Sequence, residues 1–151
     1  MRKIICSVQA GKLDRDLIPS LEAALKRIYR EQFDAAHRVV VLWCEVPQGQ
    51  GFTEGRLSDV SWVMVEVDDG LDQAAREKAM QAMANEWARI ARVSTEKLMI
   101  TLSDSSVFNQ YLAANRRRIR PLRRPGFVLA TLLRLWHTRR RDGYASINAN
   151  F

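Results

Sequence analysis

The sequence predicts an α/β domain of the α+β kind, in which tandem βαβ units form a four-stranded mixed sheet with two helices on one face. Two observations support this prediction. Residues 2–102 contain two successive copies of the order strand, helix, strand, and the copies are of similar size. The chain of 151 residues also suits one domain, because such a length buries roughly 68 to 70% of the unfolded surface.

The first unit begins with a strand over residues 2–9. A helix is predicted over residues 14–33, because apolar side chains recur there at the spacing of one helical face. Residues 39–44 are continuously apolar, which is typical of a strand buried on both faces. The turn-rich stretch PQGQGFTEG follows and separates the two units. The helical face consists of Leu17, Leu21, Ala24, Leu25 and Ile28.

The second unit repeats this order. Residues 60–67 (VSWVMVEV) are predicted as a strand, and a helix follows over residues 71–92 after the turn DDG. Residues 97–102 (KLMITL) form the closing strand. Right-handed crossovers place both helices on the same face of the sheet. The opposite face is then bare and apolar, so we expect a homo-oligomer that covers it.

The two cysteines and the amino-terminal stretch indicate the compartment. Cys6 and Cys44 lie in predicted strands, so we expect buried thiols and no disulfide. The apolar stretch at the start breaks at Ser7 and Gln9, and no small-residue cleavage site follows. We therefore expect a cytoplasmic protein without a signal peptide or a transmembrane segment. No metal-ligand spacing, phosphate loop or Ser-His-Asp arrangement is found, so no metal or cofactor is predicted.

Charge divides the chain into two parts. Residues 1–114 hold 14 Lys and Arg against 16 Asp and Glu, whereas residues 115–151 hold ten Arg against the single acid Asp142. The segment 119–151 is predicted as a basic extension with an apolar helix of about 16 residues, which is too short to cross a bilayer. Its last nine residues, GYASINANF, are expected to form a strand or hairpin that pairs with a neighbouring subunit.

Three interpretations of the extension stay open. Its apolar side chains can pack on the oligomer, the helix can lie on a membrane surface, or the arginines can bind nucleic acid. Phosphate binding does not explain Leu129, Leu132, Leu133 and Trp136, because leaving each exposed costs roughly 1.5 to 3 kcal/mol. We therefore expect packing on the oligomer, with the arginines near Asp68, Asp69 and Asp72, and regard nucleic-acid binding as the weaker alternative.

Residues 1–118 resemble the tautomerase superfamily, the group that includes macrophage migration inhibitory factor. The tandem βαβ order and the early first strand carry this resemblance. Within the group the chain is most similar to malonate semialdehyde decarboxylase-like proteins. Four stretches support that similarity: AGK, PQGQGFTEG, VSTEKLMITL and SDSSVF. The resemblance implies a short α+β fold, a trimer, no cofactor and the chemistry of an isomerase or lyase.

The resemblance also implies acid-base catalysis by an amino-terminal proline, whose amine has its pKa lowered in an apolar pocket. Position 2 of this chain is Arg2. Because the initiator Met is normally removed only before a small residue, we expect Met1 to stay. The free amine is then primary and lies one residue away, about 3.3 Å along the strand. Arg2 either replaces the proline as an electrophile or is a solvated strand-end residue.

A second departure concerns the substrate carboxylate. The decarboxylase-like relatives carry arginines at the start of the second helix, where Gly70 and Asp72 stand in this chain. Asp68, Asp69 and Asp72 are equally explained as helix-start acids. An acidic group of the relatives corresponds to His37 or Arg38, although His37 also fits a surface loop. The remaining candidate pocket residues are Met1, Lys3, Phe108 and Arg116.

These departures predict a superfamily member that lacks the usual tautomerase and decarboxylase activities and serves as an oligomeric scaffold or small-molecule binder. A small acidic molecule is the candidate ligand. The main alternative is a divergent tautomerase, hydratase or decarboxylase that uses Arg2 with other pocket residues. The second alternative is nucleic-acid or membrane-surface binding through the arginine-rich extension.

Overall fold

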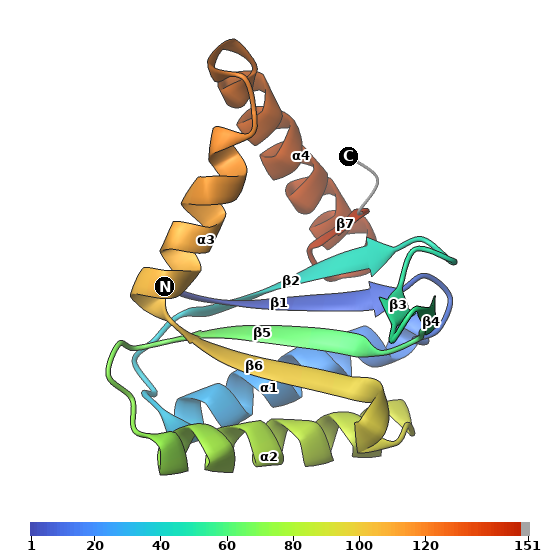
Figure 1. Ribbon diagram of the computed structural model, residues 1–151, viewed down its shortest axis with the longest axis vertical. Helices are drawn as coiled ribbons and strands as arrows, with labels where there is room; N and C mark the ends of the chain where they lie inside the picture. Colours follow the sequence, from blue (N-terminus) through green and yellow to red (C-terminus); the bar gives the residue numbers. More distant parts are fainter. Residues whose placement is uncertain (149–151) are drawn as a thin grey trace.

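A mixed sheet of five strands, in the order β6-β5-β1-β2-β7, forms the centre of the computed structural model (Figure 1). The structure describes residues 1–148, except for the side chains of Arg116 and Asn148. Helices α1 and α2 cover one face of the sheet, and helices α3 and α4 rise from the other. The elements are β1 (Arg2–Gln9), α1 (Ile18–Gln32), β2 (Val39–Val46), β3 (Phe52–Thr53), β4 (Arg56–Leu57), β5 (Ser61–Val67), α2 (Gln73–Ala91), β6 (Leu98–Asp104), α3 (Ser105–Arg117), α4 (Arg124–Asp142) and β7 (Ser146–Asn148).

The two βαβ units predicted from the sequence are present. Strand β1 pairs in parallel with β2, and β5 pairs in parallel with β6, as a helical crossover requires. The units meet where β1 runs antiparallel to β5, with Ile4 opposite Val65. The mixed sheet with two helices on one face is thus confirmed, and β3 and β4 form a small hairpin in the linker between the units.

The first helix begins differently from the sequence expectation. A 3₁₀ turn, η1 (Arg15–Leu17), precedes α1, and Asp14 caps it by accepting a hydrogen bond from the Asp16 amide at 3.1 Å. Helix α1 then has Pro19 in its first turn, where the missing amide hydrogen costs no helical bond. Buried residues of α1 include Leu21, Leu25 and Ile28, which belong to the predicted apolar face.

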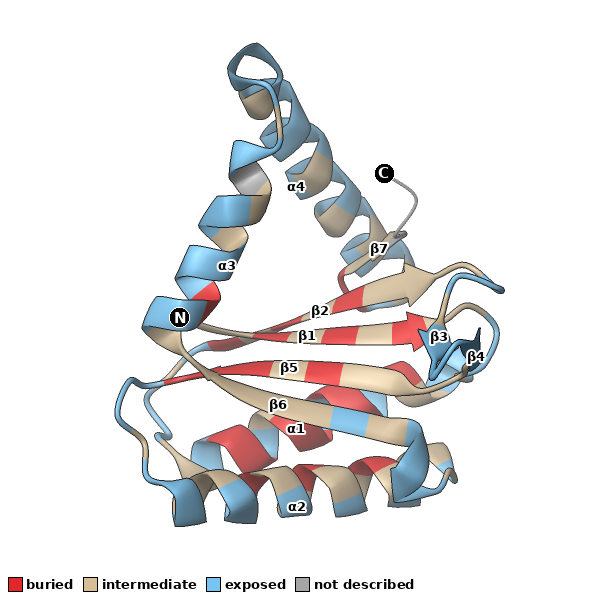
Figure 2. Ribbon diagram, in the orientation of Figure 1, coloured by how far each residue is buried: buried red, intermediate tan, exposed pale blue. Residues whose placement is uncertain are grey.

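The core lies between the sheet and helices α1 and α2, where the buried residues are coloured red in Figure 2. Alternate residues of β1 (Ile4, Cys6 and Val8) point into it, which is the two-residue period of a strand. Trp43 of β2 stacks on Trp87 of α2 with ring centroids 5.8 Å apart, and both rings are almost completely buried. This pair joins the first unit to the second.

The cysteines lie in strands as expected. Cys6 is buried, Cys44 is half-buried, and both thiols are free. No helix within residues 1–148 is both long and apolar enough to cross a membrane.

The predicted sheet of four strands is one strand too small. The short strand β7 pairs in parallel with β2 of the same chain, with Ser146 opposite Trp43. The chain returns to the sheet because Gly143, at φ 81°, ends α4 in the left-handed conformation that glycine adopts readily. Over Ser146–Asn148 this segment thus pairs within the subunit, as an edge strand of the sheet, and its expected pairing with a neighbouring subunit stays a prediction. Residues 149–151 lie outside the described part.

The carboxyl-terminal third contains two helices where the sequence predicted one. Helix α3 has 13 residues, and α4 has 19, which is longer than expected. Together with η3 (Pro121–Arg123) they form an arm that projects away from the sheet (Figure 1). In Figure 2 most of the ribbon of this arm has the colour of exposed residues, and none of the residues of α4 is buried. Packing of α4 on its own subunit is therefore slight.

We expect Trp87→Ala to lower the free energy of unfolding by about 3 to 5 kcal/mol, because it leaves a cavity between the two units. Urea unfolding followed by circular dichroism measures this loss. The control is Leu57→Ala on β4, where the side chain is 68% exposed and the expected change is within about 0.5 kcal/mol. Equal effects of the two substitutions would contradict the central role of the tryptophan pair.

Candidate functional site

The sequence-predicted site lies where the start of β1, the end of β5 and the start of α3 meet. The antiparallel register of β1 and β5 brings the first residues of β1 beside Glu66. The parallel pairing of β5 with β6 puts Val67 opposite Asp104, so Ser105 follows at the same end of the sheet. Two backbone pairings thus assemble a polar cluster from three distant parts of the chain. We call Arg2, Lys3, Glu66, Asp68 and Ser105 the amino-terminal cluster.

Glu66 is the centre of this cluster. Only 1% of the residue is exposed, which is unusual for a carboxylate. Its Oε2 accepts hydrogen bonds from the Lys3 amide at 3.1 Å and from the Lys3 Nζ at 3.0 Å. Its Oε1 accepts from the Ser105 hydroxyl at 2.7 Å and from the Arg2 Nη1 at 3.4 Å. Both oxygens of the buried carboxylate are therefore satisfied by fixed donors.

Arg2 links Glu66 to the protein surface. Its Nη1 also donates to the Ser105 hydroxyl at 2.8 Å, and its Nη2 pairs with Asp68. The side chain is 19% exposed, and its Nε is buried without a hydrogen-bond acceptor within the described residues. Both ends of the guanidinium fork are thus bound to acids or hydroxyls of the same subunit.

The ionisation of Glu66 follows from these contacts. Burial alone favours the protonated acid, but hydrogen bonds from Ser105 and Lys3 outweigh it and hold the pKa of Glu66 below its ordinary value. Tyr29 donates a hydrogen bond to the Glu66 carbonyl oxygen at 3.0 Å from beneath the sheet. Burial, assisted by the Glu66 charge and opposed by Arg2, raises the pKa of Tyr29 to about 12.

Lys3 has an apolar neighbour as well as an acidic one. Its Nζ lies 5.6 Å from the centre of the Phe108 ring, within the range of a cation–π interaction. Phe108 is 1% exposed and extends from the first turns of α3. The structure therefore brings together three predicted pocket residues, namely Arg2, Lys3 and Phe108.

The other predicted pocket residues have separate contacts. Met1 is 67% exposed. His37 Nδ1 lies 2.9 Å from Asp34 Oδ2, and the carbonyl oxygen of Arg38 accepts a hydrogen bond from the Arg2 amide at 2.9 Å. The side chain of Arg116 lies outside the described part of the chain.

Gly70 and Asp72 belong to the turn before α2. Gly70 has φ 79°, which glycine adopts without strain. Asp72 caps α2 by accepting a hydrogen bond from the Ala75 amide at 2.8 Å. Asp69 accepts from the Ser106 amide at 3.0 Å, so all three neighbouring acids have local partners. Within this subunit Arg139 of the extension lies 3.7 Å from Glu22, and docking of the extension on these acids in an oligomer stays a prediction.

Sequence reasoning missed Glu66 and Ser105. One signal for Glu66 was present, since it is the only charged residue in the otherwise apolar run VSWVMVEV. A carboxylate in a buried strand requires a partner, and a search for one points to the cations at the start of β1.

The amino-terminal cluster is balanced in charge. The cations of Arg2 and Lys3 face the carboxylates of Glu66 and Asp68 at ion-pair distance. This arrangement stabilises three chain segments. Because both cations are already paired, neither is available to bind the carboxylate of an added ligand. No three His, Cys, Asp or Glu side chains within residues 1–148 are grouped closely enough to hold a metal ion.

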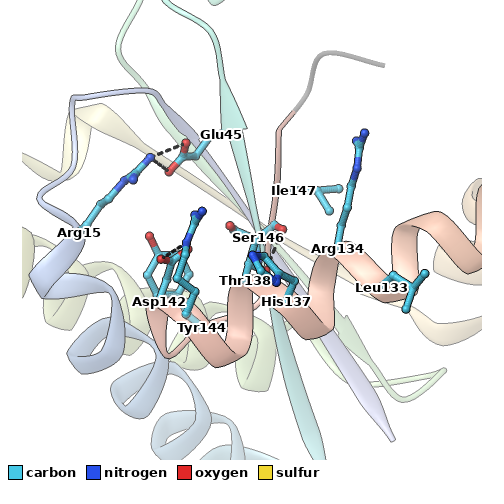
Figure 3. Close-up of a pocket in the computed structure, with 11 residues that line it drawn as sticks. Arg15, Glu45, Leu133, Arg134, His137, Thr138, Asp142, Tyr144, Ser146 and Ile147 are labelled. Atoms are coloured by element: carbon cyan, nitrogen blue, oxygen red, sulfur yellow. Dashed lines mark hydrogen bonds and ion pairs between the residues drawn. The ribbon is translucent and has the colours of Figure 1, made fainter.

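A cavity of about 660 Å³ lies elsewhere, between α4, β7 and the outer end of β2 (Figure 3). Its lining includes Arg15, Glu45 and His137, and none of the amino-terminal cluster. The predicted site and this cavity are therefore separate features of the subunit.

We expect Glu66→Gln to destabilise the fold by about 3 kcal/mol at neutral pH, because Lys3 loses its counter-charge and Arg2 loses one of its two acidic partners. The lowered pKa of Glu66 means that its ionised form stabilises the folded state above the ordinary carboxyl range, and that this stability is lost as the pH falls through the folded-state pKa. The variant should therefore show a shallower loss of stability in acid.

Urea unfolding at a series of pH values measures this slope. The control Glu31→Gln removes an exposed pair with Arg27 and should cost less than about 1 kcal/mol. An unchanged acid slope in Glu66→Gln would contradict the assigned ionisation.

At the level of sequence, no protein-family model and no curated protein matches this chain. Solved structures do match, each over 68% of the chain, which is about the share that residues 2–104 make up. N1, a member of the cis-3-chloroacrylic acid dehalogenase family, has a TM-score of 0.63 at 17% identity, and 73% of that chain is covered.

Two further structures give similar values. The F6 fused 4-OT, an asymmetric trimer, has a TM-score of 0.61 at 15% identity over 85% of its chain. Pt0534 inactivated by 2-oxo-3-pentynoate has a TM-score of 0.60 at 16% identity over 84% of its chain. These neighbours are members of the tautomerase superfamily. The chain therefore has the fold of tautomerase-superfamily structures.

Proposed function

We propose that this chain is a tautomerase-superfamily protein without the catalytic amino-terminal proline, and that its amino-terminal cluster is structural. The observation that carries the proposal is the buried Glu66 carboxylate, which engages both Arg2 and Lys3. On this proposal the usual tautomerase and decarboxylase activities are absent, and the protein serves as an oligomeric scaffold. The same proposal includes that, within the superfamily, the chain is most similar to malonate semialdehyde decarboxylase-like proteins.

A general acid or base must reach the proton that it transfers, and an electrophilic arginine must be free to bind the substrate. Arg2 fulfils neither condition, because Glu66, Asp68 and Ser105 already engage its fork. The Met1 residue is 67% exposed, so the amino terminus is not enclosed in an apolar pocket. These contacts support a loss of the superfamily chemistry.

One observation favours an enzyme as the second candidate. Lys3 Nζ lies between the Glu66 carboxylate and the Phe108 ring, and the side chain is 26% exposed. A lysine beside a carboxylate and an aromatic ring can act as an acid–base group toward a small carbonyl compound. A divergent tautomerase, hydratase or decarboxylase would then use Lys3 with Arg2.

We also propose a cytoplasmic homo-oligomer, most simply a trimer. The sheet face opposite α1 and α2 carries half-buried apolar side chains, which alternate along the strands with the core residues. Helix α4 adds an exposed apolar stripe, because residues four apart share one helical face. The open face consists of Ile5, Val40, Leu42, Trp62 and Met64, and the stripe consists of Val128, Leu129, Leu132, Leu133 and Trp136.

The stripe is the strongest support for this assembly. Its five side chains are 43 to 59% exposed in the single subunit, and such a contiguous apolar surface marks an interaction site. The F6 fused 4-OT structure is itself a trimer. The proposed division of the chain, with residues 1–118 as the fold unit and 119–151 as the extension that packs on the oligomer, follows from the same surfaces.

We expect the unmodified protein to turn over neither phenylpyruvate nor 2-hydroxymuconate above the uncatalysed rate. We also expect 2-oxo-3-pentynoate, a conjugated alkynone to which nucleophiles add, to leave the protein mass unchanged while Met1 is retained. An ultraviolet assay measures turnover, and intact-mass spectrometry measures labelling. Arg2→Pro should permit removal of Met1 and restore a secondary amine that the reagent labels.

Robust turnover by the unmodified protein would contradict the structural role. Turnover that is lost in Lys3→Met but retained in Lys12→Met would establish the enzyme candidate instead, because Lys12 lies at the opposite end of β1.

We expect light scattering to show a trimer, and Leu132→Asp to dissociate it, because a buried carboxylate without a partner is costly. Leu57→Asp is the matched control, since Leu57 is similarly exposed but lies on β4, outside the open face and the stripe. Deletion of residues 119–151 should also dissociate the oligomer, although it removes β7 from the sheet as well.

A stable monomer at micromolar concentration would contradict the assembly. Retention of RNA by such a monomer, weakening steeply with salt, would favour the nucleic-acid alternative instead.

A further inference from the structure

The cavity beside α4 has two walls from different parts of the chain (Figure 3). One wall is the last half of α4, including Arg134, His137 and Thr138. The other wall combines β7, the end of β2 and the η1 turn. With a volume of about 660 Å³, it falls within the range of roughly 300 to 1,000 Å³ that is typical of small-molecule sites.

The walls of the cavity are fixed by hydrogen bonds. The Ser146 amide donates to the Thr138 hydroxyl at 3.0 Å, which ties β7 to α4. The Trp43 amide donates to the Ala145 carbonyl oxygen at 2.9 Å, which ties the same segment to β2. Tyr144 is 3% exposed, and its ring packs edge-on against Trp43 with centroids 6.4 Å apart. The cavity is therefore formed before any ligand arrives.

Four of the charged groups in the cavity neutralise one another. Arg15 Nη2 donates to both oxygens of Glu45 at 3.0 Å. Arg141 donates to both oxygens of Asp142, at 2.8 and 2.9 Å. These two pairs leave Arg134 as the uncompensated cation of the cavity.

Arg134 and His137 are the polar groups available to a ligand. Neither side chain has a hydrogen bond or an ion pair with another part of residues 1–148. They lie three residues apart and therefore on one face of α4. Hydrogen bonds from Arg141 hold the pKa of Asp142 below its ordinary value, and Arg15 and His137 act in the same direction. With Arg134 unpaired, the cavity carries a net positive charge.

The remaining lining is partly apolar. Leu133 is 57% exposed, and Ile147 of β7 is half-buried beside Arg134 in Figure 3. A ligand that fits this surface has an apolar body next to its charged group. A second negative charge is disfavoured, because the carboxylates of Glu45 and Asp142 also line the cavity.

We propose that the cavity binds a small organic monoanion, with a carboxylate on Arg134 and His137 and an apolar body on Ile147. The planar guanidinium of Arg134 donates two parallel hydrogen bonds to the carboxylate, and His137 donates a third. This site is distinct from the amino-terminal cluster and does not depend on the proposed function.

Isothermal titration calorimetry with the full-length protein tests the proposal, with hexanoate as the probe and hexanamide as its neutral counterpart. We expect hexanamide to bind about tenfold more weakly, which corresponds to the loss of charge-assisted hydrogen bonds. Affinity should rise from butyrate to hexanoate, and Ile147→Ala should reduce this rise. Inorganic phosphate should not displace hexanoate.

The informative variant is Arg134→Gln, whose exposed side chain makes it compatible with folding, as an unchanged unfolding midpoint would verify. We expect it to weaken hexanoate binding by about tenfold. Arg118→Gln is the matched control, because this exposed arginine follows α3 and does not line the cavity. Absence of hexanoate binding, equal binding of hexanamide, displacement by phosphate, or equal effects of the two arginine variants would each overturn the proposal.

Discussion

The buried carboxylate of Glu66 is the constraint on which one whole end of the subunit depends. A charge with 1% exposure is tolerated only where donors surround it, and these donors come from β1 and α3. The same contacts fix where β1 starts and the direction in which α3 leaves the sheet. Removing the Glu66 carboxylate would leave Lys3 without its acidic partner, whereas Arg2 would keep Asp68.

The periodic part of the fold was predictable because its signal is local. Apolar spacing located α1, α2 and the four long strands within a few residues, and the crossover rule placed both helices on one face. Strand β7 was different, because three residues carry too short a pattern and its position depends on a distant partner in β2. Helix α3 follows β6 directly, so no turn signal marks the boundary at Ser105.

The candidate site was predictable only in part, for a geometrical reason. Arg2 and Lys3 were found through their position at the start of the chain, and Phe108 through the stretch SDSSVF. Glu66 alternates with buried valines of β5, which is also the pattern of an ordinary solvent-facing residue. Only the antiparallel register between β1 and β5 shows that this side of the strand faces two cations. Such a register is a property of tertiary structure, and a short stretch of sequence does not reveal it.

The shortness of β7 has a consequence for the outer edge of the sheet. It pairs only with Trp43, Cys44 and Glu45, so the first half of β2 has no strand on its outer side within residues 1–148, although β1 pairs with its inner side. Along Val39–Val46 the outer edge of β2 is therefore open at first and then paired with β7. Open ladders accept additional strands, because their amide and carbonyl groups still lack partners. A strand of a second polypeptide can therefore pair with the outer side of the first half of β2 without any change in the hydrogen bonds of the sheet itself.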